Sequence, residues 1–468
     1  MQCLVLDQKH KKENHQEINL LYYTYNKSPL IRAFIVLILF IMDIASIHNL
    51  FLQCDSVSID TRKILPNSLF VAIKGENFDA NTFAEEALTK GAKYVIIDNS
   101  DYYIDERTVL VADSLKALQQ LAQFHRNYLK IPIIALTGSN GKTTTKELIH
   151  TVLSKKFNTK ATVGNLNNHI GVPLTLLSFT KETEIGVVEM GANHKKEIEF
   201  LCQLATPDYG YITNFGKAHL EGFGGVEGVI EGKSEMYTYL SFANKTTFIN
   251  LEDPIQVEKS QSLTCYSFGI NKSNAAVNIT AIEANPFVTI KYDGYSIVTH
   301  LIGLYNANNI NAALTIGKYF EVPMDLIKEA LENYIPENNR SQMVVKGSNT
   351  ILLDAYNANP SSMAVAIDNF IQLEKPNKIM VLGDMFELGE ESLFEHQQLV
   401  QRLSGVLDVR CFFVGKAFFD CGIVQENFQF YATFDAFSAY LTNHPFSDAT
   451  LLIKGSRAMA LERTLNYL

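Results

Sequence analysis

An excess of positive charge is absent from this chain. Its 468 residues include 40 Lys and Arg against 50 Asp and Glu, which gives a formal net charge of −10 at pH 7. Proteins that bind duplex DNA usually carry a basic surface, so this balance argues against a nucleic-acid partner. Hydrophobic residues make up 47% and charged residues 19%, as expected for a globular protein. The length is too great for one ordinary core and predicts about two to four domains.

Cysteine pairs with the spacing of a zinc or redox site are also absent. The six cysteines are spread along the chain, at Cys3, Cys54, Cys202, Cys265, Cys411 and Cys421. No two of them are separated by two residues, the spacing that such sites commonly use. A reduced protein of the cytoplasm is therefore expected.

A long apolar run is absent as well. The most apolar stretch, LIRAFIVLILFIMDIASI (Leu30 to Ile47), contains Arg32 and Asp43, which bracket only ten residues. A transmembrane helix needs about 20 apolar residues, so no stable membrane insertion is expected.

Two other interpretations of the N-terminal region remain. Lys11, Lys12 and Lys27 precede the apolar run, as in a signal peptide, although no clean small-x-small cleavage site follows. Alternatively, residues 1–41 are not part of the working protein and Met42 is its start.

Short apolar strands alternating with helical patterns are what the chain does contain. Strands are predicted at SLFVAIKG (68–75), IPIIALTG (131–138), IGVVEMG (185–191) and DYGYITNFG (208–216). TFAEEALTKGAKYVIID (82–98) predicts a helix, a glycine stop and a strand. Such alternation favours a mostly parallel, doubly wound sheet.

The pattern changes in the second half of the chain. Period-two alternation around Asp293 and Gly294 predicts a hairpin, and 306–320 predicts a helix. A further α/β unit then follows, with strands predicted at TILLDAY (350–356), KIMVLGDM (378–385), VRCFFVG (409–415) and TLLIKGS (450–456). We find no internal repeat and no low-complexity linker.

The segment LTGSNGKTTTKELI (136–149) has the features of a phosphate cradle. Two residues separate Gly138 from Gly141, so the common pattern G-x-x-x-x-G-K-[ST] is not met. A strand nevertheless leads into a glycine turn whose N–H groups can face an anion, and a helix N-terminus follows. Lys142 can reach phosphates and Thr143 can offer its hydroxyl to Mg²⁺. The alternative is a capped helix start, since Thr and Ser cap helices too.

Several polar residues follow predicted strands, where ligands bind in open α/β sheets. Glu189 ends one strand and suits Mg²⁺, although it could be an ordinary exposed glutamate. His219 follows another strand. A lone histidine is more often structural than a ligand, so His219 is a candidate only because it is expected at the same sheet edge as Lys142 and Glu189. Lys233, fourteen residues later, would normally be a solvated helix charge.

Two further sets of polar residues could bind the oxygens of an anionic group or a sugar. Asn165, Asn167 and Asn168 precede an apolar helix, where a polar turn is an equally good interpretation. The strands of the last unit end near charged and amide side chains that can clamp a carboxylate or phosphate, namely Asp354, Asn357, Lys454 and Arg457.

Taken together, these motifs resemble those of the Mur ligase family. TGSNGKTT, GNLNNHIGVP, EMGANHKKEI, AHLEGFG, EGKSEMY, LYNANNINAA, DAYNANPSSM, VLGDMFELGEES and KGSRAMALE match in order and spacing, from about Ile44 to the C-terminus. The shortened loop is the family's own form. DAYNANP and EMGANH favour members that join D-alanyl-D-alanine to a UDP-N-acetylmuramoyl tripeptide over members that add a single amino acid.

The resemblance implies an α/β protein of three domains: a small N-terminal α/β domain, a central doubly wound P-loop ATPase sheet and a Rossmann-like C-terminal domain. The expected bounds are 42–130 for binding the UDP-linked substrate, 131–335 for binding ATP and 336–468 for the ligase domain. Residues 1–41 match nothing in the family. A monomer using ATP and Mg²⁺ in the cytoplasm is implied.

The resemblance also assigns roles to residues. The implied catalytic residues are Lys142, His219 and Lys233. The implied ATP-binding residues are Gly138, Ser139, Asn140, Gly141, Lys142, Thr143, Thr144, Asn306, Asn309, Asp354 and Tyr356. The implied substrate-binding residues are Ser58, Asp60, Thr61, Arg62, Asn165, Asn167, Asn168, Asn357, Lys454 and Arg457. The implied metal ligands are Thr143, Glu189, His219 and Lys233 as a carbamate. Tyr305 departs from the family, which often has histidine there, so the packing around adenine is expected to differ.

Three rival functions remain at this point. Another ligase on the same plan, such as a folylpolyglutamate synthase, would share the ATP site and differ in substrate. A nucleotide-binding switch would hydrolyse ATP regardless of acceptor and would not need the KGSRAM cluster. A membrane-anchored scaffold would depend on residues 30–41.

Overall fold

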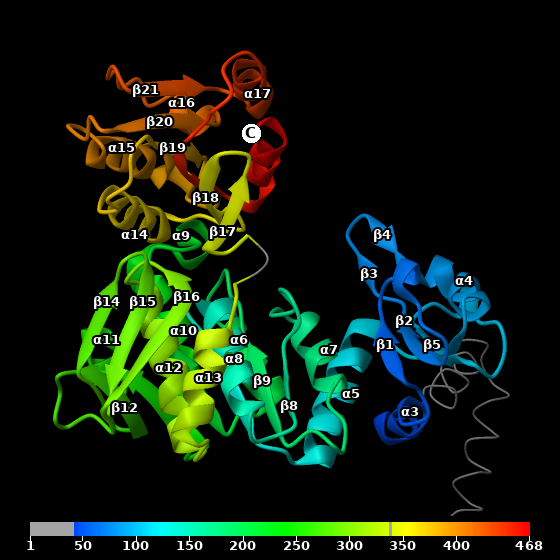
Figure 1. Cartoon of the computed structure of the whole chain (residues 1–468). Helices are drawn as coiled ribbons and strands as arrows, with labels where there is room; N and C mark the ends of the chain where they lie inside the picture. The colour runs from blue at the N-terminus through cyan, green and yellow to red at the C-terminus, as the bar shows by residue number, and fades with distance from the viewer. Residues whose placement is uncertain (1–41, 337–338) are drawn as a thin grey trace, which may run out of the picture. The chain divides into compact units, whose positions relative to one another are not determined.

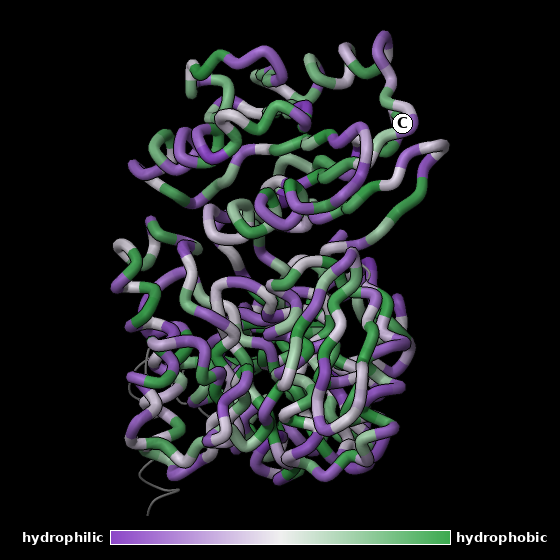
Figure 2. The backbone as a smooth tube through the Cα atoms, turned by 60° about the vertical axis from the view of Figure 1, so that its left-hand side comes forward, coloured by the Kyte–Doolittle hydropathy of each residue, from purple (hydrophilic) through white to green (hydrophobic). Residues whose placement is uncertain are grey.

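The computed structural model describes residues 42–336 and 339–468, and the chain divides into two compact units between Tyr128 and Leu129 (Figure 1). The predictions for residues 1–41, including the choice among anchor, signal peptide and dispensable extension, lie outside the described residues. Within the described ranges, no helix is both long and apolar enough to cross a bilayer. Hydrophobic and hydrophilic segments instead alternate over short distances along the chain (Figure 2).

The first unit is a small parallel α/β sheet. Its strands follow the order β1-β2-β5-β6, and every neighbouring pair is parallel. Its elements are α3 (Ile44–Phe51), β1 (Ser56–Ser58), η1 (Thr61–Lys63), β2 (Ser68–Val71), β3 (Lys74–Gly75), β4 (Phe78–Asp79), η2 (Ala80–Phe83), α4 (Ala84–Thr89), β5 (Ala92–Ile97), η3 (Ser100–Tyr102), β6 (Thr108–Leu110) and α5 (Ser114–Leu129).

The local predictions for this unit hold with one difference. As predicted, α4 is followed by Gly91 and then by β5. Gly91 has a φ of 104°, a conformation that ends the helix and that glycine adopts without steric cost. The strand predicted over 68–75 stops at Val71. Lys74–Gly75 forms a separate short hairpin with Phe78–Asp79 instead.

A buried pair of histidines joins α3 to α5. Nε2 of His48 lies 3.0 Å from Nδ1 of His125, and the rings of Phe51, Phe124 and Tyr128 surround them. Burial, with a smaller contribution from His125, lowers the pKa of His48 from 6.5 to about 4. His48 is therefore neutral in the folded protein at pH values where it takes up a proton in the unfolded chain.

We expect the thermal stability to fall as the pH falls from about 6.5 towards 4. In that window His48 is protonated in the unfolded chain but neutral in the folded protein, so protonation favours unfolding. His48→Gln keeps a polar partner for His125 but removes this titration, and its melting temperature should depend less on pH. Melting curves over pH 4.5–7.5, with the exposed His444→Gln as control, measure the difference. Parallel curves for wild type and His48→Gln would exclude this source of acid sensitivity.

The second unit contains a seven-stranded sheet in which every neighbouring pair is parallel, as predicted. The strand order is β13-β12-β11-β10-β7-β9-β8. Its strands are β7 (Ile133–Thr137), β8 (Thr159–Ala161), β9 (Ile185–Glu189), β10 (Tyr209–Ile212), β11 (Thr246–Asn250), β12 (Thr264–Ile270) and β13 (Val277–Ile279).

Helices cover both faces of this sheet (Figure 1). One layer holds α6 (Lys142–Leu153), α12 (Asn306–Tyr319) and α13 (Met324–Asn333), whose apolar faces form one core with the strands. The other helices are α7 (Gly171–Leu177), α8 (Glu197–Ala205), α9 (Leu220–Phe223), α10 (Val226–Phe242) and α11 (Pro254–Lys259). The carboxyl ends of β7, β9 and β10 therefore lead into loops at one edge.

A small antiparallel sheet follows, with β14 (Ala281–Ala284), β15 (Phe287–Tyr292) and β16 (Tyr295–Ile302). The predicted hairpin is confirmed, because Asp293 and Gly294 connect β15 to β16 with φ values of 47° and 78°. Two successive positive φ angles match the twist of a tight hairpin.

A six-stranded sheet forms the last part of the second unit. Its order is β17-β18-β22-β19-β20-β21, and only β17 is antiparallel to its neighbour. Its elements are β17 (Gln342–Lys346), β18 (Asn349–Asp354), α14 (Pro360–Ile371), β19 (Lys378–Gly383), η4 (Gly389–Glu391), α15 (Ser392–Arg402), β20 (Val409–Val414), α16 (Lys416–Phe419), β21 (Phe428–Tyr431), α17 (Phe434–Asn443), β22 (Thr450–Lys454), η5 (Arg457–Met459) and η6 (Leu461–Tyr467).

All four strands predicted for this region are present, and the sequence missed the two edge strands β17 and β21. The first unit has one parallel sheet, and the second unit contains both the seven-stranded and the six-stranded sheet. Together they form the predicted α/β fold of three domains. The residue at which the ATP-binding domain gives way to the ligase domain, expected near 335, stays a prediction.

Candidate active site

The glycine-rich loop connects β7 to α6. Gly138 and Gly141 have φ values of 147° and 77°, which L side chains rarely adopt. A Cβ atom at Gly141 would lie 2.5 Å from Oδ1 of Asn309, so the close approach of α12 also requires glycine here. The N-terminus of α6 thus opens on a cavity of about 1090 Å³, lined within the second unit. Helix N-termini of this kind bind phosphate groups.

Lys142 is the first residue of α6 and lines this cavity. Its ammonium donates to the carbonyl oxygen of Gly138 at 2.7 Å. Burial lowers its pKa; Arg340 adds to the lowering and Glu189 opposes it. The backbone of the loop therefore holds the Lys142 side chain beside the loop itself.

Hydrogen bonds from several elements fix the loop. Ser139 Oγ donates to the carbonyl oxygen of Gly216 at 2.8 Å, and Thr213 Oγ1 donates to that of Asn140 at 2.6 Å. The amide of Asn359, at the N-terminus of α14, donates to Oδ1 of Asn140 at 2.7 Å. The last contact ties the six-stranded sheet to the phosphate loop.

A buried carboxylate lies beside the loop. Glu189, which is 1% exposed, accepts from Thr143 Oγ1 at 2.9 Å and from Asn167 Nδ2 at 2.8 Å. Nζ of Lys146 lies 4.0 Å from its Oε2. A hydroxyl and a carboxylate oxygen are hard ligands of the kind that Mg²⁺ takes, so Thr143 and Glu189 fit such an ion.

The other two predicted metal residues lie further along the wall. His219 lines the cavity, while Lys233 is 1% exposed and is not among the described residues that line it. Burial lowers the pKa of His219, and burial together with Lys142 lowers the pKa of Lys233 well below its usual value. Across the part of the chain that the structure describes, no three His, Cys, Asp or Glu side chains form a group able to hold a metal.

Asn306 and Asn309 occupy the first turns of α12 and line the cavity. Asn309 donates to Oδ1 of Asn306 at 2.9 Å and accepts from Thr145 Oγ1 at 3.0 Å. The nearby Tyr305 hydroxyl lies 2.8 Å from Ser341 Oγ. The structure thus groups both predicted asparagines, although their amides already bond to one another.

Side chains of the six-stranded sheet face the same cavity. Nζ of Lys454 lies 2.6 Å from Oδ2 of Asp354, and the guanidinium of Arg340 lies 3.6 Å from the ring centre of Tyr356. The lining residues from this region are Arg340, Ser341, Asp354, Tyr356, Asn357, Asn359, Ser361, Ser362, Val365 and Lys454. Arg457 is not among them; it pairs with Glu462 at 2.9 Å.

The predicted substrate residues divide between the two units. Asn165, Asn167 and Asn168 line the cavity, and Oδ1 of Asn168 also accepts from the N–H of Gly171, the first residue of α7, at 2.9 Å.

The last four predicted substrate residues, Ser58, Asp60, Thr61 and Arg62, lie in the first unit, in and after β1. Asp60 accepts from the Nε and Nη2 of Arg62 at 2.9 Å each, and Ser58 Oγ donates to the carbonyl oxygen of Asp60 at 3.0 Å. The carbonyl oxygen of Thr61 accepts from Lys90. Their role stays a prediction.

The sequence missed several lining residues. Asn359 and Ser361 lie within the motif DAYNANPSSM but were given no role, and Arg340 lies in none of the quoted motifs; only the docking of distant segments brings these residues to the loop. Lys146 does not line the cavity, but its ammonium lies near the buried Glu189; it could have been found, since it follows Lys142 by four residues and lies on the same helix face.

The chain matches three family domains in sequence. Residues 53–126 match the Mur ligase family catalytic domain, 136–317 the Mur ligase middle domain and 339–457 the Mur ligase glutamate ligase domain.

Relatives named UDP-N-acetylmuramoyl-tripeptide–D-alanyl-D-alanine ligase are similar over most of their length. The protein of Bacillus subtilis (strain 168) is 36% identical, with 88% of this chain and 92% of that protein covered. The protein of Escherichia coli (strain K12) is 35% identical, with 88% and 93% covered.

Solved structures agree with these sequence matches. MurF from Acinetobacter baumannii superposes with a TM-score of 0.77 at 32% identity, covering 88% of this chain and 92% of that one. MurF from Thermotoga maritima, solved in complex with ADP, gives a TM-score of 0.77 at 26% identity, covering 89% and 97%. On the three domain matches and these relatives, the chain belongs to the Mur ligase family.

Proposed function

We propose that this chain catalyses the ATP-dependent ligation of D-alanyl-D-alanine to a UDP-N-acetylmuramoyl tripeptide, a step in peptidoglycan precursor synthesis. The observation that carries the proposal is one cavity in which the family's phosphate loop faces Asp354, Tyr356 and Lys454 of the six-stranded sheet. Relatives with that activity in their names cover almost the whole chain. The ADP complex of the Thermotoga maritima protein supports the nucleotide.

The first step moves the γ-phosphoryl group of ATP to the terminal carboxylate of the tripeptide, giving an acyl phosphate and ADP. A carboxylate is a poor electrophile, and this step gives it a good leaving group. Two anions must approach each other, and the ammonium of Lys142 offsets their repulsion. The N-terminus of α6 contributes partial positive charge at the same place.

Mg²⁺ fits the oxygen donors of Thr143 and Glu189, and the family implies His219 and Lys233 as further ligands. Such an ion would neutralise phosphate charge during transfer. The chain's own part is to hold these donors in place: Asn167 orients Glu189 by donating to its second oxygen.

In the second step the free amine of D-alanyl-D-alanine attacks the acyl carbon, an amide bond forms and phosphate leaves. The amine must arrive deprotonated and aligned, and water must be kept from the acyl phosphate. Asn357 and Lys454, on the six-stranded sheet, are our candidates for binding the dipeptide. Ser58, Asp60, Thr61 and Arg62 are our candidates for the uridine nucleotide end. We further propose a cytoplasmic monomer.

The substrate that accepts the phosphoryl group and the amine that is joined to it distinguish this function from that of a folylpolyglutamate synthase. Incubation with ATP, D-alanyl-D-alanine and a UDP-muramoyl tripeptide carrying diaminopimelate or lysine at residue three should release phosphate only when all three substrates are present. Free D-alanine and L-glutamate serve as control acceptors. A folylpolyglutamate synthase shares this fold, with a TM-score of 0.57 at 14% identity. Phosphate release with a folate and glutamate, or without any acceptor, would contradict the proposal.

A further inference from the structure

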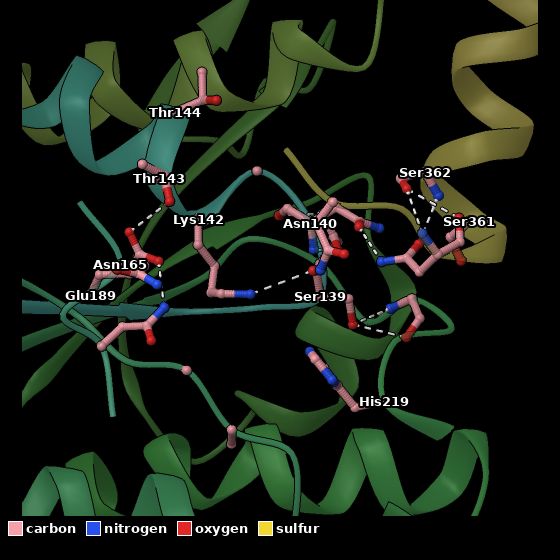
Figure 3. A pocket seen from close by; sticks show the side chains of 18 of the residues that line it. Ser139, Asn140, Lys142, Thr143, Thr144, Asn165, Glu189, His219, Ser361 and Ser362 are labelled. Atoms are coloured by element: carbon pink, nitrogen blue, oxygen red, sulfur yellow. Dashed lines mark hydrogen bonds between the residues drawn. The ribbon is translucent and has the colours of Figure 1, made fainter. Parts of the chain in front are cut away.

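A histidine and a glutamate from different sheets meet at the wall of the cavity. His219 precedes α9, after β10, and Glu387 lies in the loop between β19 and η4. Nδ1 of His219 lies in close contact with Oε2 of Glu387. In Figure 3 the ring of His219 points into the same space as the ammonium of Lys142. One ring nitrogen therefore faces Glu387 while the ring itself projects into the cavity.

Both residues have backbone conformations that non-glycine residues seldom adopt. The φ values are 53° for His219 and 62° for Glu387. Such conformations persist only where the surrounding structure enforces them, and they cluster at functional sites. Two of them on opposite sides of one contact indicate that the geometry of the contact is imposed by the fold.

The loop that carries Glu387 is held by hydrogen bonds on several sides. The N–H of Met385 donates to Nε2 of the buried His396 at 3.0 Å, and the N–H of Phe386 donates to Ser456 Oγ at 3.0 Å. The carboxylate of Asp384 accepts from the N–H groups of Ala417 and Phe418 at 2.9 and 3.0 Å. A loop fixed in this way holds the Glu387 backbone firmly in place.

The segment that carries His219 is fixed from the same side. The N–H of Lys217 donates to Ser361 Oγ at 2.8 Å, and its ammonium lies 2.5 Å from Oε1 of the buried Glu395. In addition, α9 packs against η4. These contacts dock the two sheets around the histidine without involving its ring.

We propose that Glu387 is a positioning residue for His219: its carboxylate accepts from Nδ1 and so presents Nε2 to the cavity as a metal-binding nitrogen. Histidines that bind metals usually donate their other ring N–H to such a partner, which fixes the tautomer and the ring orientation. Here that partner comes from the ligase domain, so the ATP-binding domain alone does not complete the metal-binding wall. This inference rests on the proposed function, in which His219 takes part in metal binding.

The test measures ADP binding to the full chain by calorimetry, with and without Mg²⁺. Glu387→Ala should lower the Mg²⁺-dependent gain in ADP affinity about 10-fold to 100-fold, while ADP affinity without Mg²⁺ stays unchanged. Glu387→Gln should recover part of the gain, because its amide oxygen can still accept from Nδ1. Glu390→Ala removes an equal charge from η4, directly after the same loop, and should bind like the wild type. Melting curves check the fold of each variant.

Two further variants separate positioning from docking and from the metal role itself. Lys217→Ala breaks the neighbouring ion pair without touching His219 and should have a smaller effect; a loss equal to that of Glu387→Ala would overturn the positioning role. If His219→Ala lowers the Mg²⁺-dependent gain and Glu387→Ala does not, the inference fails while the proposed function stands. If His219→Ala has no effect, the metal role of His219 fails and the inference fails with it.

Discussion

Replacing Lys142 with alanine is expected to lower kcat for ligation at least about 1,000-fold while leaving the fold intact. The ammonium is bonded to the loop carbonyl of Gly138 and stands at the N-terminus of α6. At that position it would meet the β- and γ-phosphates of ATP, and its charge offsets the repulsion between the phosphate and the substrate carboxylate. Phosphate release at saturating substrate concentrations measures the loss.

The matched control is Lys155→Ala, just beyond the end of the same helix. Lys155 pairs with Glu329 at 2.8 Å on the surface, and an exposed pair of this kind contributes little stability. This variant should turn over normally. Circular dichroism and melting curves establish that both variants are folded. Near-normal turnover in folded Lys142→Ala would remove Lys142 from the phosphate-binding site.

The phosphate loop could be predicted from sequence because its determinants are local. A buried strand, a glycine turn and a helix start lie within about twenty consecutive residues, and each leaves its own pattern. Glu189 was found for a related reason, since a carboxylate at the last residue of a buried strand must lie at the carboxyl edge of the sheet. In both cases the secondary structure alone fixes the position of the side chain.

Other parts of the site have no local signature. Asn359 donates to Asn140 from a position 219 residues away in sequence, and Glu387 reaches His219 from another sheet. These contacts arise when separate α/β layers dock, so no periodicity or spacing encodes them. The edge strands β17 and β21 were missed because one flank of an edge strand is unpaired and faces solvent, which weakens the apolar pattern. Arg457 was grouped with Lys454 by proximity, yet the η5 turn leads it to Glu462.

Lys233 shows how burial changes the chemistry of a residue that sequence alone treats as a surface charge. Its side chain is 1% exposed, and its ammonium lies 5.4 Å from the ring centre of Phe223. Burial and the charge of Lys142 lower its pKa well below the usual value. The neutral amine is therefore readily formed, and a neutral amine can attack CO₂. A nitrogen–carbon bond forms, a proton passes to solvent, and an anionic carbamate replaces the cation.

A carbamate at Lys233 would offer oxygen ligands of the kind that Mg²⁺ prefers, whereas an ammonium would repel the ion. We therefore expect Lys233→Ala to lose about 100-fold to 1,000-fold in kcat, comparable to the loss of one electrostatic contact in other active sites. Acetate or formate should restore part of this activity by supplying the missing oxygens. Lys233→Arg should be equally inactive but not rescued, because its cation fills the space. Phosphate release with and without added carboxylate measures the difference.

The control for a general effect of carboxylate is Lys245→Ala, at the residue directly before β11. Lys245 pairs with Asp208 at 2.7 Å outside the cavity, so this variant should be active and insensitive to acetate. Isotopically labelled bicarbonate provides a second readout that needs no turnover: wild-type protein should show a carbamate carbon signal in its NMR spectrum, and Lys233→Ala should lack it. Wild-type-like activity of Lys233→Arg would rule the carbamate out, because a guanidinium cannot form one and its charge would oppose any neighbouring metal ion.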